Sequence, residues 1–120
     1  MSMRTMRQVA LDGSAGAGTI FSEPFAPYSD SQRMAGQVKR LSGSGTLTVT
    51  LQGGWVSSDP ATATDWVDLD LDTTAIASAQ ITEMKPTAGD NAIFATFPRY
   101  RLKCVVGSAA ATGAAQILFF

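Results

Sequence analysis

Apolar and polar residues alternate with a period of two along much of this chain, as they do in half-buried β-strands. The clearest segment is "GTLTVTLQ" (45–52), in which Leu47, Val49 and Leu51 share one face and threonines occupy the other. "WVDLDL" (66–71) and "RYRLKCVV" (99–106) alternate in the same way, and "AAQILFF" (114–120) is apolar on both faces. We predict a strand in each of these four segments.

Weaker alternation marks further strand candidates at "MRQVAL" (6–11), "MAGQVKRL" (34–41), "AQITEM" (79–84) and "AIFATF" (92–97), with Gly-, Ser- and Pro-rich turns between them. No segment keeps an apolar stripe of helical period for three turns. The best helical candidate, "TTAIASAQITEM" (73–84), fits a loop followed by a strand about equally well. About eight short strands predict an all-β fold, an antiparallel, jelly-roll-like β-sandwich in which residues 1–120 form a single domain.

The first 30 residues have an alternative interpretation as an extended N-terminal arm. Pro24 and Pro27 cannot lie in central strands, because proline removes a ladder hydrogen bond. On such an arm the aromatic residues Phe21, Phe25 and Tyr28 would lie over a partner. The alternative for all three is a small local core within the same molecule.

Charge patterning limits the classes of partner. The chain has nine basic and ten acidic residues, a net charge of −1, and only 16% charged residues. This balance argues against a nucleic-acid binder held by a basic field, and it suits a protein that lies packed against neighbours. No apolar run of about 18 residues or signal-like apolar segment occurs, so we expect no membrane partner and a protein made and folded inside a cell.

The residues that carry most enzyme chemistry are scarce. Histidine is absent, which removes the commonest general base and metal ligand, and no Ser-x-x-Lys motif occurs. Cys104, the only cysteine, lies in a strand-like segment, so we expect a buried structural thiol. We expect no enzyme activity, no cofactor and no metal site.

Three aspartates at alternate positions, Asp68, Asp70 and Asp72, are the remaining candidate for chemistry. An EF-hand loop would need a glycine and a glutamate at positions that Thr73 and Ala79 occupy here. Carboxylates at alternate positions of one strand point to the same side, so we expect a solvated acidic face or an interface face.

Opposite charges are segregated in the second half of the chain. Residues 57–76 carry five acids and no base, and Arg99, Arg101 and Lys103 form a basic strand face. If the two strands lie together, the charges pair within the subunit. If they lie on opposite edges, they offer complementary surfaces to a neighbouring copy. The sequence leaves both options open.

Together, "LTVTLQGG", "TDWVDLD" and "FPRYRLKCVV" resemble a pattern of β-sandwich virion proteins of tailed bacteriophages, above all capsid decoration (cement) proteins. The resemblance covers about residues 42–106. It implies that Trp66 fills the core beside the 47–51 strand and that Arg99 and Arg101 lie on the outer face. The sequence departs from the pattern in its long loop "GGWVSSDPATAT" (53–64), where a tight turn is commoner.

The resemblance implies a structural virion protein that binds the major capsid protein or other virion proteins, as a homo-oligomer for which a trimer is the first guess. It implies no catalytic residues. The candidate interface residues are aromatic or charged: Phe21, Phe25, Tyr28, Trp55, Asp68, Asp70, Arg99 and Arg101.

Two other classes of function stay open. A carbohydrate-binding module at a tail or fibre tip would use the loop residue Trp55 for stacking on sugars. A small inhibitor of a host enzyme would be a monomer that purifies with its target and not with virions.

Overall fold

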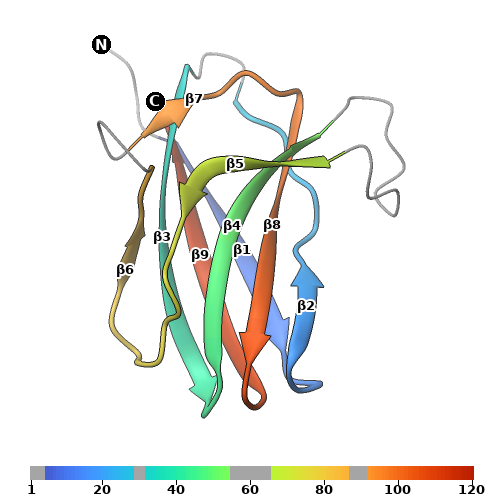
Figure 1. The fold of residues 1–120 in the computed structure, drawn as a ribbon. Coiled ribbons are helices and arrows are strands. Elements are labelled where there is room, and N and C mark those ends of the chain that lie inside the picture. Colours follow the sequence, from blue (N-terminus) through green and yellow to red (C-terminus); the bar gives the residue numbers. More distant parts are fainter. Residues whose placement is uncertain (1–4, 29–31, 55–65, 87–91) are drawn as a thin grey trace.

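The computed structural model describes residues 5–28, 32–54, 66–86 and 92–120, which form nine strands in two antiparallel sheets (Figure 1). The strands are β1 (Thr5–Gly13), β2 (Gly18–Phe21), β3 (Arg33–Gly43), β4 (Thr46–Gly54), β5 (Trp66–Asp72), β6 (Thr82–Met84), β7 (Ile93–Phe94), β8 (Arg99–Gly107) and β9 (Ala111–Phe119). The all-β antiparallel sandwich expected from the sequence is confirmed. β2 was not predicted, because its four residues are too short to show alternation.

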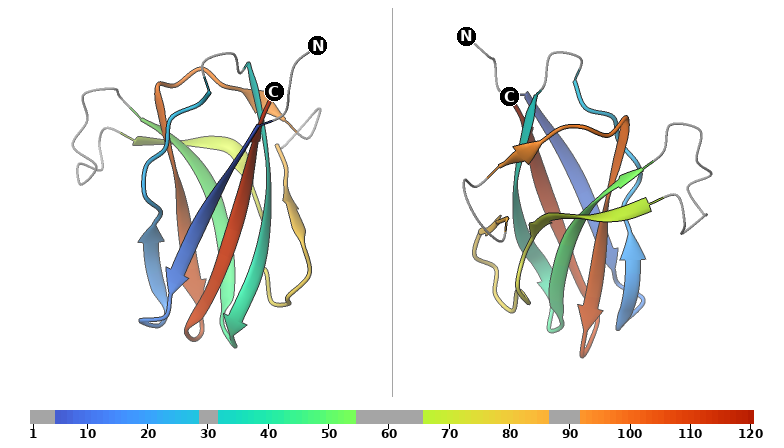
Figure 2. Two further views of the ribbon diagram at one scale, coloured as in Figure 1. Left: turned by 180° about the vertical axis from the view of Figure 1, so that it is seen from behind. Right: turned by 45° about the horizontal axis from the view of Figure 1, so that its top comes forward.

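The two sheets form the two layers of the sandwich (Figure 2). The five-stranded sheet has the order β1-β9-β3-β6, with β7 also paired to β3, and the four-stranded sheet has the order β2-β8-β4-β5. β1 begins and β9 ends at one end of the sandwich, since Thr5 pairs with Phe119. The turns after β1, β3 and β8 lie at the opposite end (Figure 1). In the described part of the chain no helix is long and apolar enough to cross a membrane.

The core lies between the sheets and follows the predicted alternation in the two central strands of the four-stranded sheet. Leu47, Val49 and Leu51 of β4 are fully buried, and β8 contributes Tyr100, Leu102, Cys104 and Val106. The hydroxyl of Tyr100 accepts a hydrogen bond from the backbone N–H of Phe97 at 2.8 Å, so this core phenol is not left without a partner. Burying these apolar faces is the main favourable term in the stability of such a fold.

Cys104 is buried in this core, as the sequence predicted. Burial raises the pKa of its thiol to about 11, because the charged thiolate loses its hydration. The fraction of reactive thiolate at neutral pH is therefore very small, as expected for a structural cysteine.

The N-terminal segment does not form a free arm in the described residues. β1 pairs with β9 over its whole length, and β2 pairs with β8. Phe25 forms a backbone bridge with Tyr100, and its ring lies 6.2 Å from the Tyr100 ring. The ring of Tyr28 lies 5.6 Å from that of Phe119, and its hydroxyl donates a hydrogen bond to the Met6 carbonyl. Phe25 and Tyr28 therefore pack at the edge of the core within the subunit, and residues 5–28 lie against β8 and β9 in place of extending as an arm.

β5 departs from the predicted alternation. Only Leu71 is fully buried; Leu69 packs partly against the core, and Val67 is exposed. The pairs Gln52–Asp68 and Thr50–Asp72 are four residues apart on β5 but two apart on β4, so β5 is bulged. A bulge bends an edge strand away from its partner, which explains why strict alternation failed here.

Trp66 does not fill the core beside Leu47, Val49 and Leu51, as the resemblance implied. It is buried on the outer face of the four-stranded sheet, paired in register with Gly54. A Cβ atom on Gly54 would lie 2.7 Å from two ring carbons of Trp66, so glycine at position 54 leaves the space that the indole fills.

Candidate functional site

The outer face of the four-stranded sheet carries an arginine held between two aromatic rings. The Arg101 Cζ atom lies 4.0 Å from the ring centre of Phe21 and 4.4 Å from that of Trp66. Although Arg101 points away from the core, it is only 6% exposed. We call Phe21, Arg101 and Trp66 the Arg101 stack. Cation–π contacts of this kind are strongest where water is excluded from the guanidinium.

Strand register places polar partners beside the Arg101 stack. Arg101 of β8, Gln52 of β4 and Asp68 of β5 form one row across three strands. The Arg101 Nε–H donates to the Gln52 Oε1 at 2.7 Å, and the Gln52 Nε2–H donates to the Asp68 Oδ1 at 2.8 Å. Gln52 is itself buried, so its amide must find partners in the protein, and both ends of it do.

Lys103 completes the network with an ion pair. Its Nζ atom lies 3.0 and 2.9 Å from the two Asp68 carboxylate oxygens. The acidic and basic segments therefore pair within the subunit at this point, although β4 separates β5 from β8. The side chains of Lys103 and Asp68 are 27% and 54% exposed, so the pair contributes only modestly to stability. The hydrogen bond from Lys103, followed by that from Gln52, lowers the pKa of Asp68 below its ordinary value of 3.8.

This ion pair predicts a small, pH-dependent contribution to stability. A lowered carboxyl pKa stabilises the fold above the ordinary value of 3.8, and the contribution is lost as pH falls through the folded-state pKa. We expect Asp68→Asn to be less stable than the parent at about pH 7 by roughly 0.2–1 kcal/mol. The difference should close below about pH 4, as measured by urea unfolding across pH. Lys103→Met removes the other partner of the ion pair and is the matched variant. A difference in unfolding free energy that persists in acid would contradict the ion pair as its cause.

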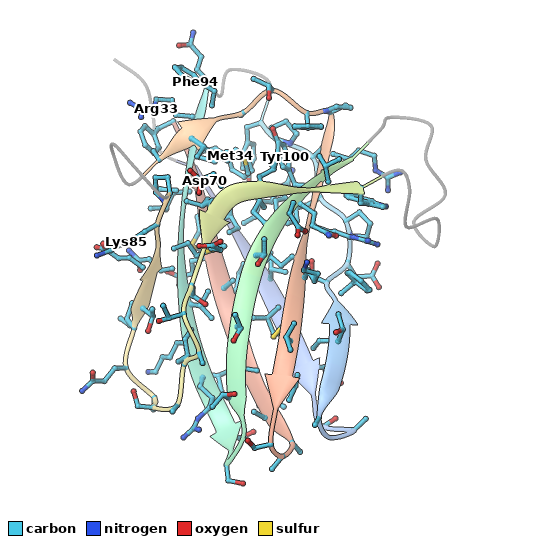
Figure 3. All side chains as sticks on the ribbon, viewed as in Figure 1. Arg33, Met34, Asp70, Lys85, Phe94 and Tyr100 are labelled. Carbon is cyan, nitrogen blue, oxygen red and sulfur yellow. The ribbon has the colours of Figure 1, made fainter. Side chains whose placement is uncertain are left out.

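The structure separates the other candidate residues. Arg99 lies in the next row, in register with Gly54 and Trp66. Asp70 is exposed on the bulged part of β5 (Figure 3), and Phe25 and Tyr28 belong to the core edge. Trp55 lies outside the described residues. Of the eight predicted residues, the structure therefore brings Phe21, Asp68 and Arg101 together.

Sequence reasoning missed two members of this network, Gln52 and Trp66. It placed the third, Lys103, on the basic strand face without counting it among the candidate interface residues. Gln52 ends the alternating segment "LTVTLQ" on its polar face, which gave no sign that its amide is buried. Trp66 was assigned to the opposite face of its sheet. The available signal was the pair Gly53–Gly54, because small residues inside a sheet allow a large ring to lie over the backbone.

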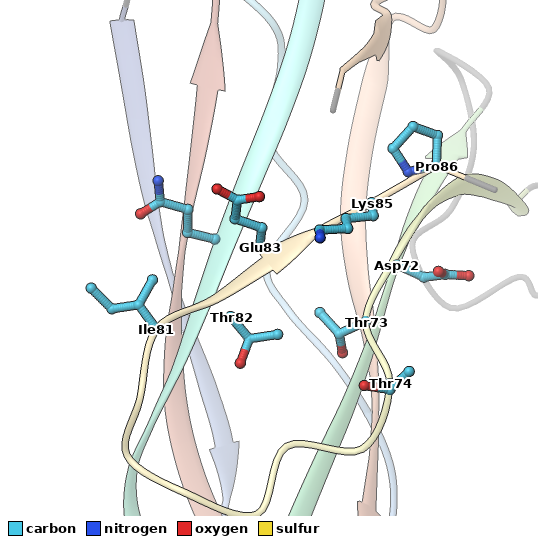
Figure 4. A pocket seen from close by; sticks show the side chains of 9 residues that line it. Asp72, Thr73, Thr74, Ile81, Thr82, Glu83, Lys85 and Pro86 are labelled. Atoms are coloured by element: carbon cyan, nitrogen blue, oxygen red, sulfur yellow. The ribbon is translucent and has the colours of Figure 1, made fainter. Parts of the chain in front are cut away.

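A polar cleft opens between β6 and the segment that follows β5 (Figure 4). Its volume is about 730 Å³, and Asp72, Thr74, Thr82, Glu83 and Lys85 are among the residues that line it. The backbones of Asp72 and Lys85 bridge the two sheets at this cleft. Within the described ranges, no three Cys, Asp or Glu side chains gather in a way that could hold a metal ion.

Comparison with known proteins identifies no family. A scan against family models and a search of curated proteins both find no match. Among solved structures, the crystal structure of PirA is 16% identical and similar over 96% of this chain and 93% of that chain, with a TM-score of 0.49. A structure described as Bacillus endospore appendages that form disulfide-linked pili is 13% identical over 98% of this chain and 87% of that chain, with a TM-score of 0.47.

A structure of infectious bursal disease virus, Gx strain, is 12% identical over 98% of this chain and 32% of that chain, with a TM-score of 0.44. At these identities and scores, the likenesses do not bear on function. The fold defines the class of protein, an all-β sandwich of two antiparallel sheets. Its function has to be inferred from its own surfaces.

Proposed function

We propose that this chain is a structural virion protein of a tailed bacteriophage, and that it binds the capsid surface as a decoration (cement) protein. The observation that supports this most directly is the Arg101 stack on the outer face of the four-stranded sheet. Aromatic residues and arginine are the residue types that dominate binding energy at protein interfaces.

The surface around the Arg101 stack is apolar and exposed. Phe21 is 49% exposed, and Val105, which faces the same side of the sheet, is exposed to a similar degree. Val105 and Thr19 form the next row of the sheet, beyond the row of Lys103 and Phe21. Large exposed apolar residues that cluster in this way mark interaction sites.

The geometry also supports a rigid contact surface. Arg101 is fixed by two rings and by Gln52 before any partner binds, so little side-chain freedom would be lost on binding. The Asp68–Lys103 pair lies beside this centre and is more exposed, as polar rim groups are. In this proposal the capsid protein covers Phe21 and Val105, and the charged rim fixes the orientation.

Mass spectrometry of purified virions tests the proposed role directly. A shell protein that follows capsid symmetry should be present in on the order of hundreds of copies per particle. A small copy number would point to the tail. Absence from virions would overturn the proposal. If the protein instead bound immobilised glycans, saccharide binding would be favoured, and the polar cleft beside β6 would be the candidate binding site among the described residues.

Replacing Phe21 by alanine should weaken binding to isolated capsid shells by about tenfold or more, because a central aromatic anchor would be lost. Co-sedimentation with shells measures this. Phe94→Ala is the matched control: Phe94 is also an exposed phenylalanine beside an arginine, with the Arg33 Cζ atom 5.6 Å from its ring centre, but it lies at the end of the sandwich (Figure 3). Equal losses in both variants would count against the Arg101 stack as the contact surface.

A further inference from the structure

The outer face of the five-stranded sheet carries no charged residue on its central strand, β9. β9 lies between β1 and β3, and its odd-numbered residues from Ala111 to Phe119 are buried in the core. Its outward-facing residues include Ala114, Gln116 and Leu118, none of them charged. A solvated sheet face normally presents charged and polar residues along its length, so a central strand with Ala114 and Leu118 outward and no charge indicates a face that is covered.

The next feature is a row of amides across this face. Strand register places Gln8 of β1, Gln116 of β9 and Gln37 of β3 side by side. A primary amide both donates and accepts hydrogen bonds, so such a row is complementary to a second copy of itself. An apolar partner would leave these amides without hydrogen bonds, at a cost in binding energy.

The shape of this face, with protruding side chains beside a hollow, is also complementary to a second copy of itself. Leu41 and Ile81 are 60% and 67% exposed, and both line a hollow of about 310 Å³. Ala114 contributes to its lining, and Ala10 is the register partner of Ala114 on β1. Large side chains beside a floor of small ones allow the ridges of one copy to enter the hollow of the other.

The area and the charges of this face also fit a second copy of the chain. β1 and β9 have nine residues each and β3 has eleven. At about 3.3 Å per residue and 4.8 Å per strand, these three strands give a footprint of roughly 30 by 14 Å, or on the order of 900 Å² for two copies before the side chains and the short β6 are added. The exposed charges of this face include Asp12, Lys39 and Glu83, and Glu83 is the register partner of Gln37 at the end of the amide row. A two-fold arrangement can set Lys39 of one copy against Asp12 of the other.

We propose that the outer face of the five-stranded sheet packs against the same face of a second copy around a two-fold axis. The inference deepens the proposed structural role and rests on it only for its biological purpose, since the capsid-binding surface lies on the opposite sheet. The homo-oligomer is then built from pairs, in place of the trimer that the resemblance suggested. Each dimer presents two Arg101 stacks on its two outer surfaces.

Sedimentation velocity and light scattering of the purified full chain at roughly 10–100 µM test this pairing. We expect a particle of twice the chain mass of 12.6 kDa. Ala114→Arg places a long charge at the centre of the face and should shift the protein to monomer. Thr48→Arg is the matched control, because Thr48 is also half-buried and outward-facing on an interior strand of the other sheet, and it should leave the dimer intact.

A second variant keeps the test decisive if Ala114→Arg does not fold. Gln116→Cys adds a thiol on the proposed interface, while the only native cysteine, Cys104, is buried and does not compete. A short bis-maleimide should cross-link this variant into dimers, and the same change at Thr48 should not cross-link. A monomeric parent chain, a trimer, or a dimer that survives Ala114→Arg and gives no cross-link at position 116 would overturn the proposal. Failure of capsid binding with an intact dimer would overturn the proposed function alone.

Discussion

Gly43→Ala is expected to lower the free energy of unfolding by about 3–5 kcal/mol, because two independent costs add at this position. Gly43 ends β3 with φ of +88°, a region in which a side chain strains the backbone. An alanine Cβ would also collide with the Ala110 carbonyl oxygen and lie 2.7 Å from the Ala111 Cα atom. Both obstacles are backbone of the facing turn, which cannot move aside as a flexible side chain can.

Gly16→Ala separates the two costs. Gly16 also has a positive φ, +113°, but nothing lies within 4 Å of the position its Cβ would take. We expect a loss of only about 1–2 kcal/mol there, from backbone strain alone. Urea unfolding followed by tryptophan fluorescence measures both variants. Equal losses at the two positions would show that the collision with residues 110–111 is relieved by movement of the turn.

Arg101→Ala is expected to cost about 2–4 kcal/mol, far more than an outward-facing arginine on a sheet usually contributes. The change removes two cation–π contacts and leaves the buried Gln52 Oε1 without its Arg101 donor. Arg101→Lys should recover only part of the loss, because an ammonium group lacks the planar face that lies between the two rings.

Lys103→Ala provides the comparison for Arg101→Ala. Lys103 lies two residues along the same strand and faces the same side, but its contact is a partly exposed ion pair with Asp68. We expect a loss of roughly 0.2–1 kcal/mol for this change. If thermal or urea unfolding gives similar losses for Arg101→Ala and Lys103→Ala, the Arg101 stack does not stabilise the fold as argued.

β4 and β8 illustrate what alternation can predict. Their apolar residues recur every second position, and in both strands the predicted face is the buried one. The sequence predicted a C-terminal strand that is apolar on both faces, and the structure shows where the two faces of this strand, β9, lie. One face is core, and the other is the exposed centre of the five-stranded sheet. The buried residues of central strands are predictable because the pleat turns every second side chain towards the core.

The candidate site was less predictable, because it depends on distances between strands. Phe21, Gln52, Trp66 and Arg101 come from four different strands, and successive members are at least 14 residues apart in the sequence. The bulge in β5 cannot be inferred from "WVDLDL", which alternates without interruption. The sequence suggested that Asp68 faces solvent, the basic strand or a neighbour, and the structure shows Lys103 and Gln52 beside it.

The pattern of residues along the chain was enough to predict the fold class, the inner faces of the central strands, the burial of Cys104 and the scarcity of chemistry-bearing side chains. These properties follow from local periodicity and composition. Three features became visible in the folded chain alone: Arg101 is buried on an outer face, Trp66 covers it, and Gln8, Gln116 and Gln37 form one row. These features depend on register, because strand order, bulges and pairing decide which residues become neighbours across a sheet, and all three are properties of the whole chain.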